Sequence, residues 1–223
     1  MASRMEARRK AMVERQIRRR GITDATLLAA FGEVPREAFV SGDLQYLAYD
    51  DRPLPIGAGQ SISQPYIVAC MIDAAGIRPG MRVLEVGAGS GYAAAVVSRI
   101  VGEVFTIERH EALAHAAAAR IEALGCYNCH VVVGDGIAGL PEEAPFDAIL
   151  VAASTDEAPD PLGRQLAIGG RMVLPVGRGV AQQLRCVERT GDECWIGRDI
   201  AAVRFVPLVP GVVLASSRGG TDR

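Results

Sequence analysis

Residues 83–91, Val-Leu-Glu-Val-Gly-Ala-Gly-Ser-Gly, limit the possible folds of this chain more than any other segment. An apolar run of strand length ends here in alternating glycines, and the sequence from Tyr92 onward is typical of a helix. Gly87 permits a tight turn, and Gly89 and Gly91 let a ligand approach the backbone because they have no Cβ. An α/β sheet builds a nucleotide-binding loop in this way, so we expect a parallel sheet with such a site.

The spacing of the glycines distinguishes between cofactors. A dinucleotide-binding fingerprint requires a third glycine at position 92, which is Tyr92. The acid that stands two residues before Gly-x-Gly-x-Gly instead resembles the first motif of S-adenosylmethionine-dependent methyltransferases. That cofactor has no pyrophosphate, and its amino and hydroxyl groups require carboxylates. We therefore expect Glu85 and Glu108 to bind it, the alternative being a glycine-rich turn without a ligand.

The composition indicates a soluble globular protein of one domain. The chain has 223 residues, 49% of them hydrophobic, and a net charge of -2. It contains no apolar run near the roughly 20 residues of a membrane-spanning helix and no apolar signal core, so we expect a cytoplasmic protein without a membrane partner. Residues 1–20 are strongly basic but carry no aromatic side chains, which favours a solvated helix over a nucleic-acid-binding arm.

The five cysteines, an odd number, do not indicate a disulfide framework. Cys126-x-x-Cys129-His130 matches the spacing of c-type haem attachment, which would require export. Because no export signal is present, we interpret both thiols as small apolar groups at the start of a buried strand. The sequence leaves open whether they also have a redox role.

From residue 79 onward, short apolar runs alternate with helical patterns, as a parallel sheet requires. Before that point we expect a helix that ends at Gly21, a second around residues 24–31 capped by Thr23 or Asp24, an irregular loop at 49–59, and a third helix from Pro65 to about Gly76. The remaining expected helices cover residues 92–101, the stretch up to 124, and 162–167, the last followed by a turn at 169–170. The expected strands cover residues 82–86, 103–107, 130–133, 146–151, 171–176, 184–189 and 203–208.

Two acids follow neighbouring strands of this predicted sheet. Ligands bind at the carboxyl ends of the strands in such folds, so Glu108 and Asp135 should lie beside the glycine loop. Glu108 is placed to bind the two hydroxyls of a ribose, and Asp135, which stands between Gly134 and Gly136, is placed near an adenine amino group. Three independent features thus predict one cofactor pocket.

Further segments are similar to those of the protein-L-isoaspartate O-methyltransferases, from about Arg8 to Leu208. The segments at 59–65, Gly-Gln-Ser-Ile-Ser-Gln-Pro, and 203–208, Val-Arg-Phe-Val-Pro-Leu, are specific to that family, whereas many methyltransferases share the glycine loop. The chain departs from the family pattern at Ser61 and Ala88, where the family usually has Thr. The other matching segments are residues 34–40, 53–58, 134–136 and 144–149.

The resemblance implies transfer of a methyl group from S-adenosyl-L-methionine to the carboxylate of L-isoaspartyl residues in damaged proteins, which leaves S-adenosyl-L-homocysteine. The ester then re-forms a succinimide, which begins repair; acceptance of D-aspartyl residues stays open. The resemblance marks Ser63 as the active-site residue and places residues 203–208 against the substrate peptide. The residues expected to bind the cofactor are Ser61, Ile62, Glu85, Gly87, Gly89, Gly91, Glu108, Asp135 and Gly136. Those expected to bind the substrate are Ser61, Val203, Arg204, Phe205 and Val206.

The chemistry of this reaction needs few catalytic groups. A carboxylate with a pKa near 4 is ionised at pH 7 without a general base, and the sulfonium methyl group is already activated. Holding oxygen, carbon and sulfur in line is the remaining task. The hydroxyl of Ser63, alone or with Ser61, can orient a carboxylate without competing as a nucleophile. We expect no metal, and structural or surface roles for His110, His115 and His130.

We therefore expect a Rossmann-like, doubly wound, mostly parallel α/β fold. Its predicted parts are N-terminal helices with an active-site loop (1–78), the cofactor-binding core (79–210) and a flexible tail (211–223). We expect a monomer that acts on isoaspartyl proteins and peptides. One alternative is a relative that methylates Asp of one dedicated peptide, and another is a module that binds the cofactor without turnover.

Overall fold

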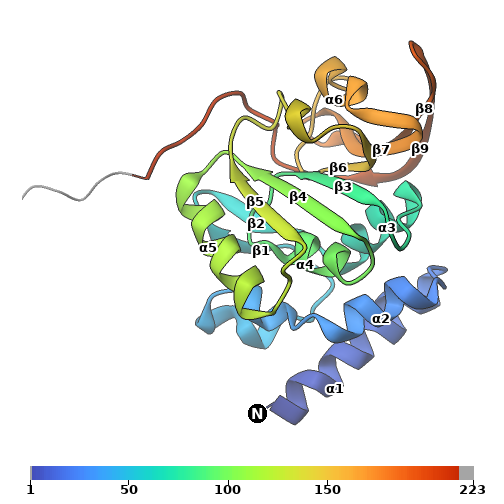
Figure 1. Cartoon of the computed structure of the whole chain (residues 1–223). Helices are drawn as coiled ribbons and strands as arrows, with labels where there is room; N and C mark the ends of the chain where they lie inside the picture. Colours follow the sequence, from blue (N-terminus) through green and yellow to red (C-terminus); the bar gives the residue numbers. More distant parts are fainter. Residues whose placement is uncertain (1, 216–223) are drawn as a thin grey trace, which may run out of the picture.

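The computed structural model describes residues 2–215 of the chain (Figure 1). Its α-helices are α1 (Ala2–Met12), α2 (Ala25–Glu33), α3 (Pro65–Ala75), α4 (Tyr92–Ser98), α5 (Glu111–Ala123) and α6 (Asp160–Arg164). A π-helical turn (Val13–Ile17) follows α1, and short 3-10 turns cover Arg18–Arg20, Arg36–Phe39, Gly42–Leu47 and Pro141–Glu143. The strands are β1 (Leu54–Gly57), β2 (Gln60–Ile62), β3 (Arg82–Val86), β4 (Glu103–Glu108), β5 (Cys129–Val133), β6 (Phe146–Val151), β7 (Leu166–Arg178), β8 (Ala181–Gly191) and β9 (Cys194–Val203).

The larger sheet has seven strands in the order β5-β4-β3-β6-β7-β8-β9. The strands from β5 to β7 are parallel, while β8 and β9 are antiparallel additions at one edge. Strand β3 lies between β4 and β6, so the chain adds strands outward on both sides of it. This confirms the predicted doubly wound, mostly parallel α/β sheet. Ligands in such sheets bind where the strand order reverses, which here is the carboxyl end of β3.

Strand β3 is buried on both of its faces. Val83 packs into a hydrophobic cluster with α3, α4 and the N-terminal helices, and Leu84 and Val86 pack into a second cluster on the opposite face of the sheet. None of the three side chains has exposed surface. A continuous apolar run is typical of parallel strands that are covered on both sides. The loop that follows β3 therefore leaves a rigid element.

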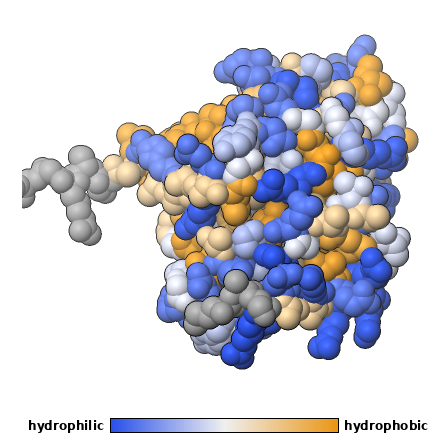
Figure 2. Space-filling model, turned by 60° about the horizontal axis from the view of Figure 1, so that its bottom comes forward, coloured by the Kyte–Doolittle hydropathy of each residue, from blue (hydrophilic) through white to orange (hydrophobic). Residues whose placement is uncertain are grey.

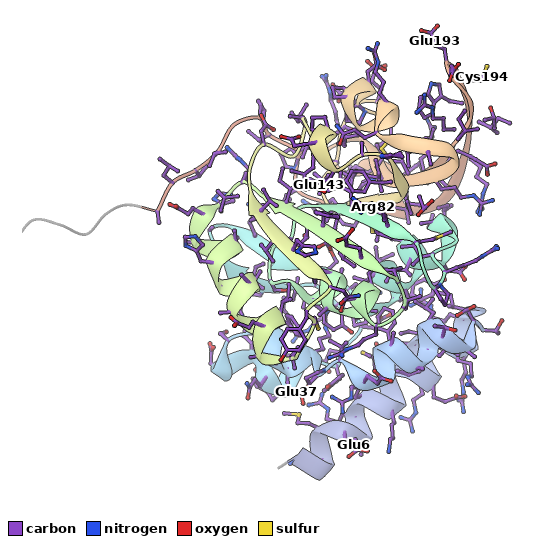
Figure 3. The ribbon with its side chains drawn as sticks, in the orientation of Figure 1. Glu6, Glu37, Arg82, Glu143, Glu193 and Cys194 are labelled. Atoms are coloured by element: carbon purple, nitrogen blue, oxygen red, sulfur yellow. The ribbon has the colours of Figure 1, made fainter. Side chains whose placement is uncertain are left out.

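Charged side chains close the amino end of β3, opposite the loop. Arg82 pairs with Glu103 at the start of β4, and its Nη2 lies 3.4 Å from Oε2 of Glu143 (Figure 3). The guanidinium also lies over the ring of Phe105, at 5.2 Å from its centroid. These contacts hold the strand ends together and leave the carboxyl edge of the sheet for a ligand.

The N-terminal residues form a layer below the sheet (blue in Figure 1). Helix α2 contacts both α3 and α4, and the π-helical turn contacts α3. The rings of Phe31 and Phe39 pack edge-on against Tyr92, with centroid distances of 6.2 and 5.5 Å. The layer thus supports the first turn of α4, directly behind the glycine loop.

Several predicted helix boundaries are confirmed. Asp24 caps α2 by accepting a hydrogen bond from the backbone N–H of Leu27 (2.8 Å), and Pro65 occupies the first turn of α3. Gly21 and Gly76 end their helices with φ values of +101° and +65°, which glycine adopts without strain.

Some predictions at the periphery are wrong. Residues 204–208 do not form a strand, because the chain leaves the sheet after β9, which itself was not predicted. Helix α6 ends at Arg164 rather than 167, because Leu166 already pairs with Phe146 in β7. Residues 169–170 therefore lie inside a strand and not in a turn. The loop predicted at residues 49–59 contains β1, which pairs with β2, and α4 ends three residues before the predicted boundary.

The surface mixes polar and apolar side chains. Figure 2 shows hydrophilic residues interspersed with smaller hydrophobic areas on the face that it turns forward. No helix in residues 2–215 is long and apolar enough to cross a membrane.

All five cysteines are free thiols. Cys126 is buried, and burial raises the pKa of the Cys129 thiol, which fits the packing role inferred for this pair. The predicted flexible tail lies, from residue 216 onward, outside the described residues.

Candidate active site

A pocket of about 1000 Å³ lies at the carboxyl ends of β3, β4 and β6. Its walls come from the glycine loop, from the hairpin and loop at residues 59–64, and from the segment at residues 202–209. Of the residues predicted to bind cofactor or substrate, all line this one cavity except Gly91 and Asp135. Three segments that are far apart in the sequence thus line the same pocket.

The glycine loop turns sharply over the end of β4. The backbone N–H groups of Gly87 and Ala88 both donate to the carbonyl of Ile107, at 2.8 and 3.2 Å. Gly87 and Gly89 have φ values of +95° and +53°, a region that side chains other than glycine rarely occupy. This backbone leaves the loop open to a ligand at both glycines.

Gly91 packs against α5. It does not line the pocket, and a Cβ at this position would lie 3.1 Å from both Ala117 Cβ and Ile121 Cδ1 of α5. Its φ of +89° starts α4. Gly91 therefore serves the close packing of α4 against α5, and its contact with the cofactor stays a prediction.

Glu108 ends β4 with its carboxylate fixed in place. Oε2 accepts a hydrogen bond from the backbone N–H of Gly89 (2.8 Å), and Oε1 accepts one from that of His110 (2.9 Å). The side chain is 5% exposed. Each oxygen keeps a lone pair for a further donor, so the carboxylate is prepared to accept from two adjacent hydroxyl groups. The two adjacent hydroxyl groups of the ribose in the predicted cofactor, S-adenosylmethionine, can donate these two hydrogen bonds.

Glu85 lies deeper in the pocket, on β3. It is 3% exposed, and the hydroxyl of Thr106 donates to its Oε2 (2.5 Å). Burial raises the pKa of Glu85 to about 8; the hydrogen bond from Thr106 opposes this shift, and the nearby charge of Glu108 adds to it. Near neutral pH this environment therefore holds Glu85 mostly in its protonated form. An amino group on a ligand would favour the carboxylate instead.

We therefore expect cofactor binding to release a proton. With a pKa of about 8, Glu85 is about 90% protonated at pH 7, and a bound ammonium group lowers that pKa. Titration calorimetry with S-adenosylhomocysteine, in two buffers of different ionisation enthalpy, should show nearly one proton released at pH 7 and fewer at pH 9. The Glu85→Gln variant should release none. Equal proton counts for both proteins would contradict this role of Glu85.

Asp135 and Gly136 follow β5. Gly136 lines the pocket, and a Cβ there would lie 2.5 Å from Val86 Cγ1, so only glycine fits. The carboxylate of Asp135 accepts from the backbone N–H groups of Ile137 (2.9 Å) and Gly211 (2.7 Å) and does not line the pocket. In this arrangement Asp135 anchors the C-terminal segment, and its contact with an adenine amino group stays a prediction.

The hairpin β1–β2 carries the predicted active-site loop. Ile62 is buried and pairs with Leu54, which fixes the hairpin on the core, whereas Ser61 is exposed at the pocket. Ser63 follows β2 and lines the pocket, and its backbone carbonyl accepts a hydrogen bond from Arg36 Nη2 (2.8 Å). Helix α3 begins two residues later, so the loop is held at both ends.

Residues 202–209 form the opposite wall. The side chain of Gln182 holds the middle of this segment, because its Oε1 accepts from the N–H of Phe205 (2.7 Å) and its Nε2 donates to the carbonyl of the same residue (3.1 Å). The backbone of Ser154 holds the residues that follow. Its N–H donates to the carbonyl of Val206 and its carbonyl accepts from the N–H of Leu208, both at 2.8 Å. The side chain of Gln182 and one isolated backbone bridge at Ser154 thus replace the strand that the sequence predicted here.

We expect Gln182→Ala to loosen this wall. The change removes both hydrogen bonds to Phe205 and leaves its backbone groups unpaired, which should raise KM for a peptide substrate roughly 10-fold and cost about 1–3 kcal/mol of stability. The dissociation constant of S-adenosylhomocysteine should change little. Gln183→Ala, on the exposed side of the same strand, is the matched control. An unchanged KM in Gln182→Ala would show that the segment holds its position without this side chain.

The comparisons with known proteins show the family of this chain. A family model described as protein-L-isoaspartate(D-aspartate) O-methyltransferase matches residues 7–212. The chain belongs to this family. It is 57% identical over 207 residues to the protein-L-isoaspartate O-methyltransferase of Methylorubrum populi, which covers 93% of this chain and 97% of the relative. A second relative, protein-L-isoaspartate O-methyltransferase 2 of Pelobacter propionicus, is 52% identical, with 92% and 91% of the two chains covered.

Solved structures of the family share the fold. A protein-L-isoaspartate O-methyltransferase superimposes with a TM-score of 0.80 at 32% identity, over 92% of this chain and 67% of that one. A Plasmodium falciparum protein described as a member of the family, in complex with S-adenosyl-L-homocysteine, superimposes with a TM-score of 0.78 at 26% identity, over 90% and 98% of the two chains.

The sequence did not reveal every residue of this family member's site. Arg109 and His110 also line the pocket, and Arg36, Gln182 and Ser154 support its walls from behind. A signal for the two pocket residues was present, since both follow Glu108 directly at the end of a predicted strand. Arg36 lies in the segment 34–40 that resembles the family, but no local pattern reveals the role of any of the three supporting residues, because each acts on a backbone group more than 20 residues away. Among residues 4–215, no three His, Cys, Asp or Glu side chains are grouped so that they could hold a metal ion.

Proposed function

We propose that this protein transfers a methyl group from S-adenosyl-L-methionine to the free carboxylate of isoaspartyl residues in proteins and peptides. The observation that carries the proposal is the single pocket in which Ser61 and Ser63 share one cavity with Glu85 and Glu108. One end offers carboxylates to the amino and hydroxyl groups of the cofactor, and the other offers neutral hydroxyls to a carboxylate. Family membership of nearly the whole chain supports the same activity.

The residues of this chain act mainly by positioning. When bound, the cofactor supplies a methyl group on a positively charged sulfur, which is already electrophilic. The isoaspartyl carboxylate is ionised at neutral pH and needs no base, so the hydroxyl of Ser63 has only to donate a hydrogen bond that turns one oxygen toward that methyl group. Glu108 and the glycine loop fix the adenosine, and Gln182 fixes the wall that faces the peptide. Such alignment can supply several kcal/mol of the barrier reduction.

A pair of peptides tests the proposal directly. The two should be identical except that one carries isoaspartate where the other carries aspartate, and transfer from labelled S-adenosylmethionine is measured for each. Labelling of the isoaspartyl peptide alone is expected. A third peptide, which carries D-aspartate, tests whether D-aspartyl residues are also methylated, since the name of the family includes them. Labelling of none of the peptides, with cofactor binding intact, would favour a dedicated partner or a module without turnover.

The remaining assignments stay predictions. We propose that the protein acts as a monomer in the cytoplasm and binds neither nucleic acid nor membranes, on the grounds of its net charge of -2 and its basic segment without aromatic residues. Part of that segment is engaged in ion pairs, including Arg20 with Asp51 (2.7 Å) and Arg8 with Asp50 (3.2 Å). Sedimentation and a filter-binding assay with DNA and RNA would test these points.

A further inference from the structure

Arg36 is a fully buried cation directly behind the active-site loop. It belongs to the 3-10 turn Arg36–Phe39 and has no exposed surface. Its Nε donates to the carbonyl of Ala48 and its Nη2 to the carbonyl of Ser63, both at 2.8 Å. The guanidinium carbon lies 4.8 Å from the centroid of the Tyr92 ring, on the first turn after the glycine loop. One side chain thus joins the N-terminal layer, the Ser63 loop and α4.

No carboxylate in residues 2–215 forms an ion pair with this charge. Among the described residues, Arg36 forms no ion pair, and its Nη1 is buried without a hydrogen-bond partner. The adjacent acid, Glu37 (Figure 3), instead accepts from the hydroxyl of Tyr49, and Asp51 is paired with Arg20. A guanidinium remains charged even when buried. Burying a charge without a partner is costly, and such costs are concentrated at functional sites.

We propose that Arg36 is a positioning residue for the carboxylate substrate. Its hydrogen bond fixes the backbone of Ser63, and its charge, which has no ion-pair partner, makes this end of the pocket favour an anion over a neutral group. The inference rests on the proposed function, because the substrate carboxylate is what the charge would attract.

The charge should act on binding more than on the transfer step. The carboxylate carries a negative charge and the sulfonium a positive one, and both are lost when the oxygen–carbon bond forms and the carbon–sulfur bond breaks. A fixed cation behind Ser63 therefore stabilises the ionised substrate more than the transition state or the neutral ester. Its loss should raise KM and should not lower kcat, because the interaction that is lost is weaker in the transition state than in the bound substrate. Because the ester is neutral, the same charge does not attract it, and this helps the product to leave.

The test measures peptide affinity in the presence of S-adenosylhomocysteine. One peptide carries isoaspartate, and the second is identical except that a carboxamide replaces the free carboxylate. We expect the wild-type protein to prefer the carboxylate by roughly 10-fold or more, as for a unit charge several ångströms away in a partly buried site. The preference should persist at high salt, because buried charges are poorly screened. Equal affinity of the wild-type protein for the two peptides overturns the proposal without any variant.

Variants then assign the preference to Arg36. Arg36→Met should abolish it by weakening the carboxylate peptide selectively, whereas a purely structural role would weaken both peptides alike. Arg36→Lys keeps the charge and should keep much of the preference. The matched control is Arg99→Met, which changes an exposed arginine directly after the C-terminal end of α4. A preference for the carboxylate peptide that survives in Arg36→Met overturns the proposal. If the wild-type protein transfers no methyl group to the isoaspartyl peptide, the proposed function is overturned instead.

Discussion

Replacing Ser63 with alanine is expected to lower kcat for an isoaspartyl peptide by about 100-fold or more, because removing one well-placed donor from a reacting oxygen typically costs that much. The Ser63 side chain lines the pocket, while its backbone is held separately by Arg36. The substitution should therefore leave the loop in place and change the affinity for S-adenosylhomocysteine less than about threefold.

The measurement is steady-state transfer from labelled S-adenosylmethionine, with cofactor affinity from calorimetry on the same preparation. Ser41→Ala, which changes an exposed serine outside the pocket, is the control and should behave as wild type. Wild-type turnover in Ser63→Ala would remove this residue from the reaction. Loss of turnover together with cofactor affinity would mean that the serine supports the pocket instead.

The second large effect is expected for Glu108→Ala, which should weaken S-adenosylmethionine binding by about 100-fold or more. The predicted contact with the ribose consists of two charge-assisted hydrogen bonds, each worth about 1.5–3 kcal/mol, and the variant cannot form them. It also releases the N–H of Gly89, which the carboxylate holds at 2.8 Å, so the glycine loop loses its fixed position. Calorimetry measures the loss directly, and kcat at saturating cofactor should fall much less.

Two further variants make this result specific. Glu108→Gln keeps one acceptor oxygen and should show an intermediate affinity, because its amide nitrogen cannot accept from a hydroxyl. Glu122→Ala removes an exposed acid on α5 and should bind the cofactor as wild type does. Thermal unfolding of each variant separates loss of the site from loss of the fold. Undiminished affinity in Glu108→Ala would place the ribose elsewhere.

The sequence predicted the parts of the fold whose signals are local. Three of the four residues Val83–Val86 are apolar because β3 is buried on both faces, and the glycines that follow are required by positive φ values at Gly87 and Gly89. The edge strand β9 lacked such a signal, because most of its residues are exposed and their polarity does not alternate. The prolines at 53 and 55 likewise concealed β1, which is stabilised by its pairing with β2 and by the burial of Leu54.

The segment at 203–208 shows why pattern and structure can disagree. Its alternating apolar residues indicate a strand, yet its backbone groups are paired by the side chain of Gln182 and by Ser154 rather than by a neighbouring strand. The same limit applies to Arg36, whose partners Ala48 and Ser63 lie 12 and 27 residues away in the sequence. Motifs identify the groups that touch a ligand, whereas the groups that hold those motifs in place become visible only in three dimensions.

The pocket draws its walls from residues between Pro53 and Val209, and its supports begin at Arg36. The methyl donor and the methyl acceptor are thus received by parts of the chain that meet only when the N-terminal layer, the parallel strands and the antiparallel edge are all assembled. No fragment of the sheet can hold both reactants. Activity in this molecule should therefore disappear in one cooperative step with global unfolding, and a partly folded copy would be inactive rather than an unselective methylating agent.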